Sequence, residues 1–146
     1  METNLEANKE LACRAWAAYD RGDEEAFGAC LDEAWREYDL SGQSGSAKEV
    51  IASMKAHRIA FPDKHTEMID LIAEGNRVVT NTITRATHTG PYLDLAPTGK
   101  PVVVYEICIH TICDGRVSKT VQAGWGPGMY EQLTGRPAPS GLDNMG

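Results

Sequence analysis

The chain has 146 residues, 42% of them hydrophobic, which is enough to bury one core and too short to divide comfortably into two domains. Its net charge is −7, from 14 Lys and Arg against 21 Asp and Glu, and the scattered basic residues argue against nucleic acid and anionic membranes as partners. No apolar stretch approaches the about 20 residues of a membrane helix, and the N-terminus lacks the pattern of a secretory signal, so we expect a cytoplasmic protein.

Two helices are predicted at the start of the chain. Thr3-x-x-Glu6 forms a capping box, and the apolar residues after it follow helical spacing, which indicates a helix over about 4–20. Asp23 can cap a second helix, whose buried stripe is expected to extend as far as Ala34. The break between them makes these helices a hairpin.

A short strand and a third helix are expected next. Residues 35–40 are rich in side chains that strands tolerate, and the loop 41–45 ends them. The capping box Ser46-x-x-Glu49 then starts a helix that Pro62 stops. Helices therefore dominate the first part of the sequence.

From residue 64 the hydrophobic period changes from about 3.6 to 2, which indicates strands. The expected strands cover residues 65–73, 77–89, 102–112 and 116–125. Segregated helices and an antiparallel meander define the α+β class, and strands this long can curve so that their concave face forms a pocket. We expect one domain over residues 1–135, with a last helical turn at 129–133, and a flexible tail over 136–146.

Five short blocks, in this order and spacing, make the chain resemble the SnoaL-like polyketide cyclase or ester cyclase family: Phe61-Pro-Asp63, Ile72–Val79, Thr87-His-Thr-Gly90, Pro97-Thr-Gly-Lys100 and Asp114-Gly-Arg-Val117. The resemblance implies the nuclear transport factor 2-like cone, in which three N-terminal helices pack on a curved antiparallel sheet enclosing a pocket. It also implies a homodimer or homotetramer, no cofactor, and a hydrophobic or aromatic small-molecule substrate.

The chemistry that this resemblance implies is an aldol ring closure on a polyketide, with a carboxylate on the last long strand as general acid and base. In the family that strand commonly reads His-Trp-Asp, whereas the corresponding residues here are Thr120-Val-Gln122. An amide cannot accept a proton at neutral pH, so the role of the aspartate does not transfer to Gln122.

The turn near Asp114-Gly115 decides which residues face Gln122. A two-residue turn places Gln122 opposite Ile107, and a three-residue loop places it opposite Glu106 with Cys108 and His110 on the same face. We prefer the three-residue loop because it gathers the polar residues inside and leaves Ile107, Ile109, Val117 and Val121 together outside.

On this register Glu106 and His110 are candidates to replace the missing aspartate in proton transfer, while Gln122 orients a substrate carbonyl. Glu106 interrupts an apolar run, so it requires a partner or a raised pKa unless it lies on the outer face. His110 could equally be a structural histidine, and Cys108 a small buried hydrophobe.

Other residues are candidates to bind the substrate, although core packing is an equally open role for the aromatic ones and Thr84 could be solvated. The full set of candidate binding residues is Trp16, Tyr19, Tyr38, His57, Phe61, Thr84 and Cys108. The spacings of His, Cys and Gly fit no metal or nucleotide motif, so we expect neither a metal nor a cofactor.

The sequence thus predicts a cofactor-independent cyclase-type enzyme of natural-product biosynthesis that uses acid/base chemistry on a polycyclic substrate. Two alternatives stay open, namely an enzyme that opens or hydrolyses epoxides and a non-catalytic binder of small molecules. Polar groups gathered around Gln122 would favour an enzyme, and a wholly apolar lining would favour the binder.

Overall fold

A six-stranded sheet organises the computed structural model, which describes residues 4–138. Four helices accompany it: α1 (Leu5–Arg21), α2 (Glu24–Ala29), α3 (Ala47–Ala60) and α4 (Met129–Thr134). The strands are β1 (Leu31–Tyr38), β2 (Ser44–Ser46), β3 (His65–Glu74), β4 (Arg77–Thr87), β5 (Pro101–Cys113) and β6 (Arg116–Trp125). The predicted α+β class, with three helices packed on a curved sheet, is therefore confirmed.

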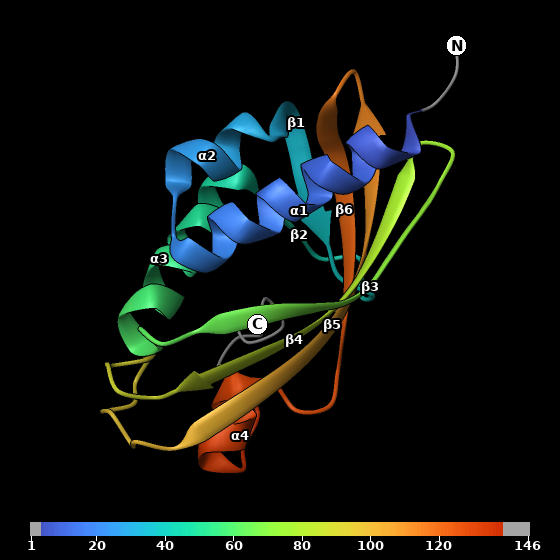
Figure 1. Ribbon diagram of the computed structural model, residues 1–146. Helices are drawn as coiled ribbons and strands as arrows, with labels where there is room; N and C mark the ends of the chain where they lie inside the picture. Colours follow the sequence, from blue (N-terminus) through green and yellow to red (C-terminus); the bar gives the residue numbers. More distant parts are fainter. Residues whose placement is uncertain (1–3, 139–146) are drawn as a thin grey trace.

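The sheet has the order β2-β1-β6-β5-β4-β3. The strands from β3 to β6 form the predicted antiparallel meander, and they bend strongly while α1, α2 and α3 gather on the concave side (Figure 1). α4 packs against β5, at the end of the molecule opposite α1 and α2 (Figure 1). The expected helical turn at 129–133 is thus present, whereas most of the predicted tail, residues 139–146, lies outside the described residues.

The prediction was wrong about the segment that follows α2. The expected helical stripe up to Ala34 does not form, because the helix ends at Ala29 and the chain enters β1 at Leu31. β1 then pairs with β6 in parallel, so the sheet is not wholly antiparallel. Hydrogen bonding along an open sheet edge outweighs the local helical pattern here. The loop expected at 41–45 also contributes β2.

The β5–β6 hairpin differs from both predicted registers. Asp114 and Gly115 have φ values of 49° and 74°, which makes a two-residue turn of the type that suits hairpins, and Cys113 pairs with Arg116. A bulge at Ser118 then shifts the register, so Cys108, rather than Glu106 or Ile107, lies opposite Gln122.

The bulge also explains which face each residue occupies. Because it adds one residue to β6, Glu106, Cys108, His110 and Gln122 still share the inner face, as expected. Val117 precedes the bulge and therefore lies in the core instead of on the outer face where we expected it.

Two apolar clusters fill the protein. The first lies under α1 and α2 and contains Leu11, Phe27, Trp35 and Val117 among its buried residues. The second joins the end of α3 to α4 and the adjacent strands, and it includes Phe61. The two clusters hold the helices on the sheet at opposite ends, so the inner face between them can carry polar side chains.

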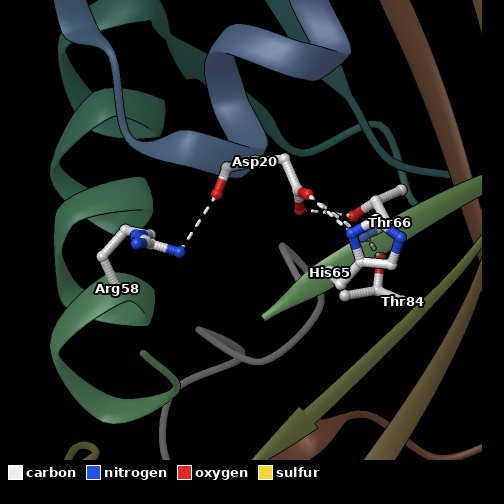
Figure 2. A network of polar contacts seen from close by, with 5 residues as sticks. All are labelled: Asp20, Arg58, His65, Thr66 and Thr84. Carbon is white, nitrogen blue, oxygen red and sulfur yellow. Dashed lines mark hydrogen bonds and ion pairs between the residues drawn. The ribbon is translucent and has the colours of Figure 1, made fainter. Parts of the chain in front are cut away.

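Asp20 ties the end of α1 to the start of β3 (Figure 2). Its carboxylate accepts hydrogen bonds from the backbone N–H of Thr66 at 3.1 Å and from the Thr66 hydroxyl at 2.7 Å. The Thr66 hydroxyl also lies 2.9 Å from that of Thr84, and Arg58 donates to the Asp20 carbonyl from α3. These contacts fix the position of α1 over the concave face.

Candidate functional site

A cavity lies between α1 and the inner face of the sheet. Its walls are mostly apolar and aromatic, with a small number of polar groups, as is typical of small-molecule sites. The lining residues are Ala15, Trp16, Tyr19, Phe27, Leu31, Trp35, Glu37, Val50, Glu106, Cys108, His110, Val117, Thr120 and Gln122. The structure therefore brings together six of the predicted site residues, three of which are the proposed catalytic ones.

A chain of aromatic rings from α1, α2 and β1 lines one side of the cavity. Trp16 meets Tyr19 with ring centroids 5.9 Å apart, and Tyr19 lies 5.6 Å from Phe27. Phe27 in turn packs edge-on against Trp35 at 6.1 Å. Such arrangements favour a flat apolar or aromatic ligand, because the rings offer extended faces and edges.

His110 is held on both sides by threonine hydroxyls. Nε2 lies 3.0 Å from the Thr80 hydroxyl and Nδ1 lies 3.0 Å from the Thr120 hydroxyl. Those two hydroxyls also accept the indole N–H groups of Trp16 and Trp35, each at 3.1 Å. Burial lowers the pKa of His110 to about 4. The imidazole is therefore neutral at pH 7, and both of its nitrogens are engaged within the protein.

Glu106 presents a buried carboxyl group to the cavity, with only 5% of the residue exposed. Burial raises its pKa to about 7, while the nearby positive charge of Lys64 acts in the opposite direction. A carboxyl group with this pKa is present both as acid and as base near neutral pH, which suits a group that both accepts and returns a proton.

Lys64 lies between α3 and β3 and is itself buried. Its ammonium is 4.3 Å from the centroid of the Tyr19 ring, a cation–π contact with one of the cavity walls. Burial lowers the pKa of Lys64 to about 8, although the charges of Asp20 and Glu106 raise it. Lys64 therefore provides positive charge near Glu106.

Gln122 and Glu106 stand where the cavity meets a second space at the mouth. That space is lined by the loop 39–41, by the glycine-rich segment 124–128 and by neighbouring residues of β5 and β6. Gly124, which has no side chain, lies opposite Glu106 in the ladder. Glu106 is thus accessible from both spaces.

Four predicted binding residues lie elsewhere. Tyr38 is on the outer face of the sheet, where the Lys119 ammonium lies 5.2 Å from its ring centroid. His57 and Phe61 pack with Tyr92 beyond the end of α3, and neither lines the cavity. Thr84 belongs to the Asp20 network (Figure 2). Each is placed by tertiary packing that strand and helix periods do not encode.

The polar residues Glu37 and Lys64 and the aromatic residues Phe27 and Trp35 were not predicted as site residues from the sequence. Glu37 left a signal, since it alternates with Trp35 along one strand and two such residues share a face. Lys64 left none, because its inward direction follows from how the chain turns between α3 and β3. Among residues 4–138, no group of three His, Cys, Asp or Glu side chains is arranged to hold a metal ion.

Comparison with known families and structures gives a consistent result. A family model described as SnoaL-like polyketide cyclase matches residues 10–124. AclR from Streptomyces galilaeus, a proposed hydroxylase, superposes with a TM-score of 0.82 at 23% identity over 94% of this chain and 87% of its own. No curated protein sequence matches the chain significantly.

Two further solved structures have the same fold. IdmH from Streptomyces antibioticus, a proposed polyketide cyclase, gives a TM-score of 0.75 at 18% identity and covers 86% of this chain and 97% of its own. A proposed SnoaL-like polyketide cyclase from Jannaschia sp. CCS1 gives 0.74 at 20% identity, over 95% and 98% of the two chains. In the described part of the chain, no helix is both long and apolar enough to cross a membrane.

Proposed function

Since the chain belongs to the SnoaL-like polyketide cyclase family and has its nuclear transport factor 2-like fold, we propose that it is a cofactor-independent enzyme of natural-product biosynthesis. It removes a proton from a carbon atom of a polycyclic or polyketide-derived substrate, as in aldol-type ring closure. Glu106 is the proton-transfer group, and Gln122 orients a substrate carbonyl by donating a hydrogen bond from its amide.

The observation that carries this proposal is the buried carboxyl group of Glu106 in a mostly apolar and aromatic cavity. A general base is most efficient when its pKa is close to the working pH. The pKa of Glu106, about 7, meets this condition at neutral pH. Because Glu106 is on β5 and Gln122 is on the neighbouring β6, the chain offers a carboxylate near the position where the family resemblance implies one on the last long strand. His110 is assigned a supporting role, because hydroxyl groups engage both of its nitrogens.

The inner cavity alone is too small for a polycyclic substrate. The inner cavity measures about 50 Å³ and the mouth about 250 Å³. Pockets for drug-sized ligands measure about 300–1,000 Å³. A polycyclic substrate therefore has to occupy both spaces, with its central part beside Glu106 and Gln122.

The proposal is tested with 2-tetralone, a bicyclic aromatic ketone, dissolved in D₂O. We expect the protein to accelerate exchange of the protons next to the carbonyl, measured by proton NMR. The rate should rise with pH through a midpoint near 7, because Glu106 must be ionised to accept a proton. Exchange no faster than in buffer alone would instead favour a non-catalytic binding protein.

We also propose that two copies of the chain associate through the outer face of the sheet. Ile107, Ile109 and Trp125 expose 40%, 39% and 58% of their surface there, and exposed apolar patches on a sheet commonly mark interfaces. Sedimentation velocity is expected to give twice the chain mass for the wild-type protein and the chain mass for I107E. A monomeric wild-type protein would contradict this proposal.

A further inference from the structure

Glu37 carries a second carboxyl group that lines the same cavity as Glu106. It lies on β1, which is separated from β5 by β6, and it pairs with Thr120 on the inner face of the sheet. Thr120 in turn pairs with His110 on β5. The cavity therefore has one carboxyl group on each side of β6, and both are among its lining residues.

The surroundings of the two carboxyl groups differ in charge. Lys64 is close enough to Glu106 to favour its ionised form. For Glu37, the described residues provide no cation that favours ionisation, and the charge of Glu106 opposes it. The other titratable groups along the cavity, Tyr19, Cys108 and His110, are held neutral by burial.

The two groups are therefore suited to different protonation states. Burial, followed by repulsion from Glu106, raises the pKa of Glu37 to about 8. Near pH 7 Glu37 is mainly a neutral acid that can donate a proton, while Glu106 is partly ionised and can accept one. Neighbouring carboxyl groups whose surroundings separate their pKa values commonly divide the roles of acid and base.

We propose that Glu37 is a second catalytic residue, the general acid that donates a proton to the substrate's carbonyl oxygen while Glu106 removes a proton from the adjacent carbon. The substrate is thus an enolisable ketone whose carbonyl points toward β1. This inference rests on the proposed function and assigns the acid half of the same reaction.

The proton transfers balance over one turnover. Glu106 takes the proton as the C–H bond breaks, and Glu37 supplies the proton of the new O–H bond, which gives an enol, a neutral Glu106 and an ionised Glu37. When the enol carbon attacks a second carbonyl, the enol proton returns to Glu37 and Glu106 protonates the new alkoxide. Both residues regain their starting states without an oxidant or a reductant.

Two variants test the proposal. E37L can neither donate a hydrogen bond nor transfer a proton, so its affinity for 2-naphthol, which has the shape of the enol of 2-tetralone, should fall at least tenfold. Its affinity for naphthalene, which lacks the oxygen, should stay within threefold. E37Q keeps a hydrogen-bond donor but has no acidic proton, so its exchange of 2-tetralone protons should slow at least tenfold. E33Q, an exposed glutamate of the same strand, is the control.

The outcomes separate this inference from the proposed function. If E37L weakens the binding of 2-naphthol and of naphthalene equally, or weakens the binding of neither, Glu37 does not contact the substrate oxygen and the inference is wrong. An E37Q protein that exchanges protons at the wild-type rate likewise rules out proton donation. If the wild-type protein exchanges no protons, the proposed function fails, and the two affinities of E37L still decide whether Glu37 binds the oxygen.

Discussion

E106Q is expected to lower the rate of 2-tetralone proton exchange by at least about a hundredfold, which is the usual contribution of a general acid or base. The amide has nearly the shape of the carboxyl group, so the cavity should keep its form. However, an amide cannot accept a proton at neutral pH. The rate is measured by proton NMR at pH 7.5, where Glu106 is mainly ionised in the wild-type protein.

The pH dependence of stability gives an independent check on Glu106. Its pKa is raised from 4.5 to about 7 by folding, so the folded state binds the proton more tightly than the unfolded state. Its contribution to stability is therefore complete below pH 4.5 and is lost as the pH rises to 7. E106Q lacks this dependence and should lose less stability than the wild-type protein over that range.

A matched control separates the role of Glu106 from a general effect of charge. Glu74 is exposed at the end of β3, and E74Q removes the same negative charge outside the cavity. We expect E74Q to exchange protons at the wild-type rate. Should E106Q retain more than half of that rate while folded, Glu106 is not the base and the proposed mechanism has to be abandoned.

The fold could be predicted because hydrophobic periods and helix caps are local signals. Ser46 caps α3 as expected, whereas α1 is capped by Asn4 and not by the predicted Thr3. The change of period at residue 64 correctly marked the start of the meander from β3 to β6, and the inner face of β5 was identified from Glu106, Cys108 and His110. The register itself was wrong. A two-residue turn followed by a bulge at Ser118 gives the same alternation of faces as the three-residue loop that we preferred.

The candidate site was less predictable because it combines residues whose direction depends on tertiary packing. Glu37 could have been found from Trp35, because both residues lay in the expected strand over 35–40 and residues two apart in a strand share a face. Tyr38, one residue further on, was assigned to the pocket and lies on the outer face. A displacement of one residue in a strand exchanges the two faces, so a strand's start matters as much as its existence.

H110V tests whether His110 is a proton-transfer group, as the sequence suggested, or a support for the cavity wall. Valine suits a strand but cannot bind the hydroxyls of Thr80 and Thr120, so we expect a loss of about 2 kcal/mol in the free energy of unfolding, measured with urea at pH 7. The indole N–H groups of Trp16 and Trp35 would still reach those hydroxyls. The folded variant should therefore retain proton exchange within about tenfold of wild type, well short of the loss expected when a general base is removed.

The loss of stability at acidic pH further distinguishes the two possible roles of His110. Its pKa falls from 6.5 to about 4 on folding, so the unfolded state binds a proton that the folded state excludes. This contribution is complete above pH 6.5 and is lost as the pH falls to 4. H110V should thus lose less stability than the wild-type protein between pH 6.5 and 4. An H110V protein with wild-type stability and no proton exchange would instead make His110 catalytic, and the acid and base roles assigned to Glu37 and Glu106 would have to be redistributed.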